Sequence, residues 1–298
     1  MDFVMTEGDV RTVQAPIRYL SEGSFVNRRF VAAGVECNTG SYEDHVMPIR
    51  DGREIRDRLG LDTHGFRLLD HRSVVRDFHD REAVDRLYAD EAVALIRQAT
   101  GAERVVSRGW MIRTSGDLSK QVKKVVGYQH QGGVQPPAGE AHVDFSPRSA
   151  PRLAEMVHRE AFPDAPGFKR FIAFSLWRAF SPPPQDCPLA VCDGRSLAED
   201  EGVPNTLHVV DEMPSPQDML AEMPGEDERI AASIFRYRPG HRWWYFSNMT
   251  ADEALLFKFY DSDHTVAWRC PHTAFYDNSL PGARIRESIE MRLVAYFD

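Results

Sequence analysis

The sequence has few cysteines. Cys37, Cys187, Cys192 and Cys270 are the only four in 298 residues, which is too few for a disulfide scaffold. Cys187 and Cys192 lie close enough in sequence to chelate a metal, but no second pair with metal-ligand spacing accompanies them. We therefore interpret these two cysteines as small packed residues.

Long apolar runs and excess positive charge are also missing. No stretch approaches the length of a membrane span, and residues 1–7 lack the apolar core of a signal peptide. The formal net charge of −9 argues against sequence-independent binding of nucleic acid, which needs a basic face. We expect a cytoplasmic protein that acts on a small molecule, without a membrane or nucleic-acid partner. The oligomeric state stays open, and a homodimer is one arrangement.

Hydrophobic residues make up 42% of the chain and charged residues 27%, as in globular proteins with a real core. The pattern after residue 104 indicates short strands separated by Pro and Gly turns, typical of a sandwich or jelly roll. We expect a mainly β fold with flanking helices (α+β) and a double-stranded β-helix core of the jelly-roll or cupin-like type. The strands predicted in this half span 105–113, 171–177, 189–192, 232–237, 241–246, 254–260, 272–276 and 288–297.

The rest of the chain predicts a single domain, 1–298, in which residues 1–103 form a mixed strand and helix extension packed on the 104–298 core. Apolar residues recur at helical spacing over 82–100, and this helix should end at Gly101. A second helix should follow Ser149 as its N-cap. Residues 199–228 are rich in Asp, Glu and Pro, which predicts an exposed insertion or lid.

A His-x-Asp pair carries the chemistry of the chain. His142 and Asp144 are two residues apart on a predicted strand, so their side chains share a face. Together with the distant His272, they match the two histidines and one carboxylate that hold non-haem Fe(II) and leave coordination positions open. We predict that these three residues are the metal ligands and the catalytic centre.

The last predicted strand has a polar face. Arg286, Ser288, Glu290 and Arg292 alternate with the apolar Ile289, Met291 and Leu293. A polar face here suits a strand that lines a polar cavity. A guanidinium can bind a carboxylate in a bidentate fork, and a serine hydroxyl can add a hydrogen bond. Arg286 with Ser288 therefore suits one end of a dicarboxylic acid such as 2-oxoglutarate.

Alternatives remain at this point. A His-x-Asp pair can occur by chance. The chain has 11 histidines, so the choice of His272 over His241 and His264 needs a reason. The reason is its context, Pro271-His272-x-x-Phe275 followed by the polar strand. The same ligands could hold zinc in a cupin-type hydrolase or isomerase that does not use 2-oxoglutarate. A non-catalytic jelly-roll binding protein is a third class.

Four residues are weaker candidates for substrate contact: Trp177, Arg178, Tyr245 and Asn248. A place in the barrel core explains most of them equally well. Asp193 and Arg195 suit a structural ion pair. Lys120, Lys123 and Lys124 form a basic cluster that could attract an anionic substrate group, although a solvated surface run is the commoner explanation.

Several blocks of sequence occur in a fixed order from about residue 104 to 297. They are HVDFS (142–146), LWRAF (176–180), PLAVCDGRSL (188–197), WWYFSNM (243–249), LLFKFYDSD (255–263), PHTAFYD (271–277) and RESIEMRLV (286–294). With these blocks the chain resembles the CmcJ/AsaB-type hydroxylase/desaturase family of the Fe(II)/2-oxoglutarate-dependent oxygenases. The N-terminal hundred residues match only loosely.

The resemblance implies a tailoring enzyme of secondary metabolism that uses Fe(II), 2-oxoglutarate and O2. It implies hydroxylation, desaturation or cyclisation through an Fe(IV)-oxo species, with release of succinate and CO2. His142, Asp144 and His272 match the iron ligands, and Arg286 with Ser288 matches the cosubstrate clamp. Arg292 is a second candidate, because the spacing resembles the two-arginine arrangement of the DNA-dealkylating branch.

Overall fold

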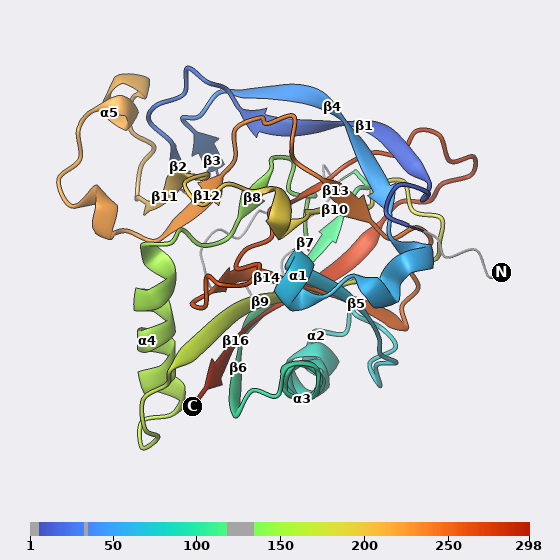
Figure 1. Cartoon of the computed structure of the whole chain (residues 1–298). Coiled ribbons are helices and arrows are strands. Elements are labelled where there is room, and N and C mark those ends of the chain that lie inside the picture. The colour runs from blue at the N-terminus through green and yellow to red at the C-terminus, as the bar shows by residue number, and fades with distance from the viewer. Residues whose placement is uncertain (1–5, 33–34, 118–133) are drawn as a thin grey trace.

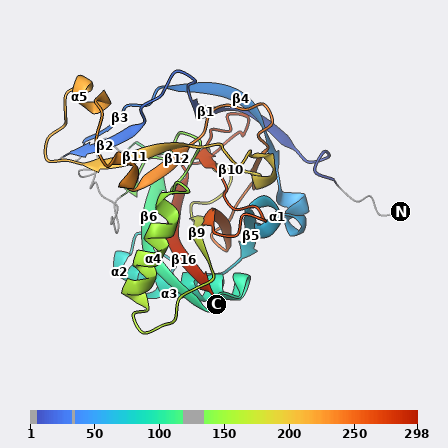
Figure 2. The ribbon, with the colours of Figure 1, turned by 60° about the vertical axis from the view of Figure 1, so that its left-hand side comes forward.

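The computed structural model describes residues 6–32, 35–117 and 134–298, so the basic cluster Lys120, Lys123 and Lys124 lies outside the described residues. These residues form two β-sheets (Figures 1 and 2). In spatial order the ten-stranded sheet contains β1 (Thr12–Leu20), β4 (Tyr42–Asp51), β13 (Trp243–Tyr245), β10 (Leu189–Cys192), β15 (His272–Ala274), β8 (His142–Val143), β12 (Ala231–Ile234), β11 (Val203–Val209), β2 (Arg28–Ala32) and β3 (Val35–Asn38). The six-stranded sheet contains β5 (Phe66–Asp70), β14 (Glu253–Asp261), β9 (Arg170–Ala179), β16 (Glu287–Phe297), β6 (Arg104–Thr114) and β7 (Val134–Gln135).

Short helices complete the chain. They are α1 (Leu61–His64), α2 (Arg81–Ala83), α3 (Ala89–Thr100), α4 (Ser149–Ala161) and α5 (Pro216–Leu220), with a π-helical turn η2 (Val84–Tyr88) and the 3-10 turns η1 (Arg53–Arg58), η3 (Gly194–Ser196) and η4 (Glu226–Glu228). In the part of the chain that is described, no helix is both long and apolar enough to cross a membrane.

The two sheets pack face to face around a shared core. Val191 on the ten-stranded sheet and Trp177 and Phe257 on the six-stranded sheet belong to one buried cluster. Because side chains alternate along a strand, the neighbouring residues point outward into separate clusters, such as Cys192 on one sheet and Leu176 on the other. This is the jelly-roll type of architecture, and the predicted fold class is confirmed.

The outer face of the six-stranded sheet is covered by α3 (Figure 1). Its buried residues Ala92, Leu95 and Ile96 follow the helical spacing that the sequence showed. Gly101 ends the helix with φ +73°, a left-handed conformation that glycine adopts without steric cost. The predicted end of this helix is therefore confirmed.

The prediction for α4 is wrong by one residue at its start. Arg148 occupies the N-cap position, and Ser149 is the first helical residue. The amide of Ser149 donates to the hydroxyl of Ser146 at 3.2 Å, so Ser146 supplies the side-chain oxygen that Ser149 was expected to provide.

The prediction that residues 1–103 form an extension packed on the core also needs correction. β1, β2, β3 and β4 are strands of the ten-stranded sheet, and β5 is an edge strand of the six-stranded sheet. β4 pairs in parallel with β13, and β2 pairs in parallel with β11. The described strands of this part thus complete both sheets, and η2 and α3 pack on the outside with Val75 and Phe78.

The predicted insertion at 199–228 is only partly right. Residues Val203–Val209 form β11, which pairs with β12 and β2. The Asp, Glu and Pro residues on either side of this strand hide its alternation in the sequence. The remainder carries α5 and η4, which project beyond the sheet in Figure 1.

Candidate metal centre and the cavity beside it

The three predicted metal ligands lie together between the sheets. His142 on β8 and His272 on β15 face each other directly in the strand register, and Asp144 lies two residues beyond His142. The Nε2 atoms of His142 and His272 lie 3.5 Å and 4.0 Å from Asp144 Oδ1. All three ligand atoms lie within 4.8 Å of one another, which suits one shared metal ion.

The backbone fixes which nitrogen of each histidine faces the centre. His142 Nδ1 lies 2.8 Å from the carbonyl oxygen of Glu140, and His272 Nδ1 lies 3.3 Å from that of Cys270. A protonated Nδ1 donates to each carbonyl, which leaves the Nε2 lone pair for a metal. The rings of Phe257 and Phe259 pack against His272 and keep this side of the centre apolar.

The charges at the centre are suited to a cation. Burial disfavours the charged form of Asp144, but the Arg292 guanidinium and the His142 imidazole outweigh this and hold its pKa well below the usual range. Burial and the neighbouring His142 lower the pKa of His272, so its imidazole is neutral at pH 7. Burial opposes a charge on His142 too, yet Asp144 raises its pKa.

One arginine of the polar strand belongs to the metal end. Arg292 Nε lies 2.7 Å from Asp144 Oδ2 and 3.1 Å from Glu290 Oε1. Glu290 also lies 3.6 Å from Arg113 on the neighbouring strand β6. The guanidinium of Arg292 is therefore held by two carboxylates of the protein.

The other arginine lies at the far end of the same row. Arg286, directly before β16, is 1% exposed. Its Nη1 donates to the Ser288 hydroxyl at 3.0 Å, and its guanidinium lies over the Trp177 ring at 5.7 Å. Its Nε and Nη2 have no hydrogen-bond partner among the described residues, and no described carboxylate forms an ion pair with it. Burial lowers the pKa of this group.

The polar row is a direct result of strand alternation. Ile289, Met291 and Leu293 point into the outer core under α3, so Arg286, Ser288, Glu290 and Arg292 face the other sheet. The alternation predicted for this strand is confirmed.

A cavity of about 340 Å³ opens at the metal end. His142, Asp144 and Arg292 form its floor. An apolar wall comes from β2, β11 and β12, and polar groups lie around the mouth. The wall consists of Val31, Leu207, Ile230, Ala232 and Ile234, and the polar groups include Arg29, Glu36, Asn38, Arg113, Gln135, Glu140 and Asn205.

The sequence missed this wall. Asn205 and Leu207 lie on β11, which was taken for an exposed insertion, and Arg29 and Val31 lie in the N-terminal part. The alternation of Asn205, Leu207 and Val209 with Thr206 and His208 is the signal that could have identified the strand.

None of the four weaker substrate candidates lines this cavity. Arg178 points to the opposite face of β9, where it donates to the carbonyl oxygen of His71 at 2.8 Å and also to that of Ala251. Tyr245 points away from the metal end, into the outer core of the ten-stranded sheet beside Phe275. The cause is the same in both cases. Side chains alternate along a strand, and each of these residues is next to one that points inward, so its own side chain points outward.

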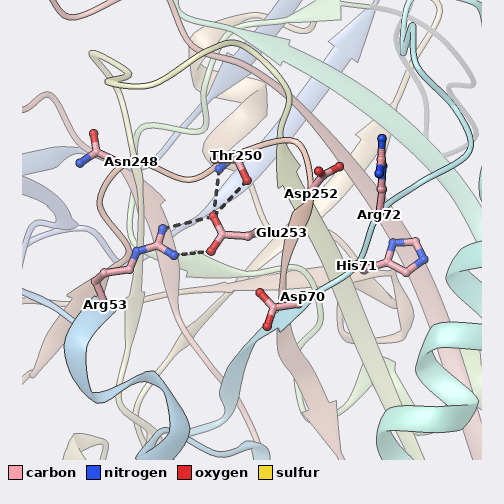
Figure 3. A pocket seen from close by; sticks show the side chains of 8 residues that line it. All are labelled: Arg53, Asp70, His71, Arg72, Asn248, Thr250, Asp252 and Glu253. Carbon is pink, nitrogen blue, oxygen red and sulfur yellow. Dashed lines mark hydrogen bonds and ion pairs between the residues drawn. The ribbon is translucent and has the colours of Figure 1, made fainter.

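Asn248 lies at a separate surface pocket with Arg53 and Glu253 (Figure 3). It has φ +51° and is exposed. The guanidinium of Arg53 is bound there by the Glu253 carboxylate (Figure 3). Trp177, by contrast, faces the inner core and contacts Arg286, so it lies at the predicted clamp.

The remaining sequence interpretations concern packing. Arg195 donates to Asp193 at 2.7 Å, and Asp193 is fully buried, which confirms the structural ion pair. Cys187 and Cys192 are buried free thiols, as predicted. His241, the alternative to His272, is bound by Glu201 at 2.9 Å on the outer side of the sheet.

Comparison with known proteins identifies relatives of the chain. The family profile described as "Oxidoreductase/YMDC permease-like domain" matches residues 17–296. The hydroxylase/desaturase efuI of Hormonema carpetanum is 29% identical over 96% of both chains. The hydroxylase/desaturase CTB9 of Cercospora beticola is 32% identical over 78% of this chain and 71% of its own.

A third relative has a solved structure. The Fe(II)/2-oxoglutarate-dependent dioxygenase nvfI of Aspergillus novofumigatus is 28% identical over 86% of this chain and 84% of its own. The solved structure titled iron and alpha-ketoglutarate-dependent endoperoxidase NvfI matches the fold with a TM-score of 0.75 at 24% identity, over 96% of this chain and 98% of that chain.

The fold and the clustered ligands define a non-haem iron oxygenase with a jelly-roll core. The chain belongs to the hydroxylase/desaturase family of the Fe(II)/2-oxoglutarate-dependent oxygenases. It is therefore an enzyme that uses Fe(II), 2-oxoglutarate and O2, and the alternatives of a hydrolase, an isomerase or a binding protein are set aside.

Proposed function

We propose that His142, Asp144 and His272 hold the iron, and that Arg286 with Ser288 holds the distal carboxylate of 2-oxoglutarate. The observation that carries this assignment is the buried guanidinium of Arg286, whose Nε and Nη2 have no hydrogen-bond partner among the described residues. Keeping an unpaired ion buried costs several kcal/mol. A ligand carboxylate in a bidentate fork would relieve that cost.

The residues at the other end fit the metal equally well. Two neutral imidazole nitrogens and one carboxylate form a set that suits Fe(II) and leaves positions open. When bound, iron and 2-oxoglutarate supply, with O2, the oxidant that removes hydrogen from an unactivated carbon of the substrate.

The protein's own residues orient and protect these groups. The carbonyls of Glu140 and Cys270 fix the imidazoles of His142 and His272. Arg292 holds Asp144 in place through its 2.7 Å contact, and Phe257 and Phe259 keep water away from His272. Trp177 covers the Arg286 guanidinium. Together these contacts hold the metal ligands near Arg292, at one end of the polar row, and the clamp at Arg286, at the other end.

The substrate we propose is a small secondary metabolite that is hydroxylated, desaturated or cyclised. Its place is the cavity of about 340 Å³ above the metal ligands, a size typical of small-molecule sites. The apolar wall formed by Val31, Leu207 and Ile230 suits the hydrocarbon part of such a molecule. Asn205 and Gln135 can bind its carbonyl or hydroxyl groups. The free thiols support a reducing, cytoplasmic location.

The test is anaerobic addition of Fe(II) and 2-oxoglutarate, followed by visible absorption. A charge-transfer band from the cosubstrate chelated to iron is expected for the wild type. Arg286→Ala should weaken 2-oxoglutarate binding strongly, while Arg18→Ala, which removes an exposed ion pair with Asp44, should leave it unchanged. No band in the wild type would overturn the assignment. A normal affinity in Arg286→Ala would transfer the clamp to Arg292.

A further inference from the structure

Another arginine lies at the cavity, on the strand next to β16. Side chains alternate along β6, and its residues Trp110 and Ile112 belong to the outer core. Arg113 therefore points inward, and it lines the cavity at the metal end. In the strand register it lies opposite Ser288, the hydrogen-bond partner of Arg286. Its backbone is thus level with the clamp, while its side chain reaches the cavity.

The guanidinium of Arg113 is held in one direction by the protein. Its Nη1 donates to the carbonyl oxygen of Pro136 at 2.9 Å, and its Nε lies 3.6 Å from Glu290 Oε2. Only 15% of the side chain is exposed. No hydrogen bond among the described residues uses its Nη2. Two protein groups therefore orient the planar fork, and its remaining edge can bind a ligand at the cavity.

The carboxylate of Glu290 is shared by two arginines. Its Oε2 lies near Arg113, and its Oε1 lies 3.1 Å from Arg292 Nε. The other partner of Arg292 is Asp144, whose negative charge faces the proposed metal ion. At the metal end of β6 and β16, two guanidinium groups then share one remaining carboxylate. A ligand carboxylate at this place would restore the balance of charge.

The two sides of the cavity differ in polarity. The side of the ten-stranded sheet contributes the apolar wall with Val31, Leu207 and Ile230, which suits the hydrocarbon part of a substrate. The side of the six-stranded sheet contributes Arg113 and Arg292, which suit an anion. A 2-oxo acid carries a carboxylate directly beside its keto group, and both must lie near the metal ligands on the cavity floor.

We propose that Arg113 binds the carboxylate next to the keto group of 2-oxoglutarate. This inference rests on the proposed function, since it takes Arg286 as the clamp for the distal carboxylate. Each carboxylate of the cosubstrate then has an arginine of its own, one from β6 and one from the start of β16. The contact made by Arg113 does not depend on the distal carboxylate, so it should also act on a shorter 2-oxo acid.

Pyruvate separates the two contacts, because it has the same 2-oxo acid group but no distal carboxylate. Arg113→Met should weaken 2-oxoglutarate and pyruvate by a similar factor of roughly 10- to 100-fold, as expected for loss of a hydrogen bond between charged groups. Arg286→Met should weaken 2-oxoglutarate and leave pyruvate unchanged. Arg113→Lys keeps the charge without the planar fork, so it should recover part of the loss for both acids.

The experiment is an anaerobic titration of the Fe(II)-loaded protein with each acid, followed by the charge-transfer absorption and by tryptophan fluorescence, with no turnover needed. Arg108→Met is the matched control, because Arg108 lies on the same strand and pairs with Glu160 at 3.1 Å. It should leave both affinities unchanged. Fe(II) affinity without either acid should not fall in Arg113→Met, because the change removes a cation near the metal.

The outcomes separate the two proposals. If the wild type gives no band with 2-oxoglutarate, the proposed function itself fails. If the band forms but the folded Arg113 variants bind both acids as the wild type does, the assignment of Arg113 is wrong and the clamp stands. A loss of 2-oxoglutarate affinity without loss of pyruvate affinity overturns it too, because Arg113 would then act on the distal carboxylate. Thermal unfolding identifies any variant that does not fold, and Arg113→Lys then provides the decisive comparison.

Discussion

Two arginines on one strand have opposite surroundings. Arg292, at the metal end, is bound by Asp144 and Glu290. Arg286, six residues earlier on the same face, is more deeply buried, and two of its nitrogens have no hydrogen-bond partner in the described part of the chain. Both are expected to be charged at neutral pH. Within residues 6–32, 35–117 and 134–298, carboxylates form ion pairs with Arg292 and none does so with Arg286.

This difference separates a structural charge from a binding charge. A buried ion with protein partners stabilises the local arrangement, whereas an unpaired one destabilises the metal-free and ligand-free fold. Natural proteins keep such a charge where a ligand supplies the missing partner, because residues needed for function often lower the stability of the fold. Loss of the Arg286 charge should therefore preserve or raise the stability of the ligand-free protein, whereas loss of the Arg292 charge should lower it.

The largest effect is expected at the metal end. Asp144→Ala removes one of three ligands and leaves Arg292 without its main partner. Loss of groups that only support the ligands costs 10–100-fold in metal affinity, so loss of a ligand should cost at least about 100-fold. Iron content after dialysis and titration calorimetry measure this. Asp44→Ala, at an exposed ion pair, is the control, and an Asp144→Ala protein that retains iron would contradict the assignment.

At the far end, Arg286→Met should lower the affinity for 2-oxoglutarate by about 30-fold or more, as expected for loss of a buried ionic partner worth 2–5 kcal/mol. Fe(II) affinity should stay unchanged. The ligand-free variant should unfold at the same temperature as the wild type or a few degrees higher, because a similar-sized apolar side chain replaces an unpaired ion. Calorimetric titration and thermal unfolding give both numbers. A large loss of stability without loss of affinity would reverse our assignment.

Arg292→Met should do the opposite in the metal-free protein. It leaves Asp144, which is nearly buried, without its cation, and should lower the free energy of unfolding by about 2 kcal/mol. Urea unfolding of the metal-free variant at neutral pH checks this. Similar changes in the free energy of unfolding of the Arg286 and Arg292 variants would contradict the distinction between a structural and a binding arginine.

A third buried arginine extends the contrast with a smaller effect. Arg28 is bound by both carboxylate oxygens of Glu226 at 2.6 Å and 2.5 Å and by the carbonyls of Met219 and Ala221. It holds the segment with α5 and η4 against β2. Glu226→Gln should loosen this segment at neutral pH, with a severalfold rise in proteolysis between residues 210 and 230 and little change in global unfolding.

The same pair predicts a pH dependence. Arg28 lowers the pKa of Glu226 from 4.5 to about 2. A lowered pKa means that the stabilisation is fully present above the unfolded value of 4.5 and is lost as the pH falls towards 2. Hydrogen exchange of residues 210–230 should therefore rise between these pH values in the wild type. In Glu226→Gln it should be high throughout, and an unchanged wild-type profile would show that the pair does not hold the segment.

The sequence predicted the site better than its surroundings, for physical reasons. Side chains alternate along a strand. This alternation brings His142 and Asp144 to one side of their strand segment, and it brings the four polar residues of the last strand to one side of β16. Alternation alone did not predict the directions of Arg178 and Tyr245. It shows which residues of a strand share a face, but which of the two faces points inward depends on how the strand pairs in the sheet. β11 was missed because its pairing with β2 joins segments 178 residues apart, as between Arg28 and Thr206, and no local pattern encodes such a contact.

The direct pairing of His142 with His272 also bears on when the centre can form. The two residues are 130 positions apart, and contacts of that separation require closure of a long loop, which makes them slow to form. All three ligands can therefore hold one iron ion only after this long loop has closed, so the complete centre belongs to a late stage of folding.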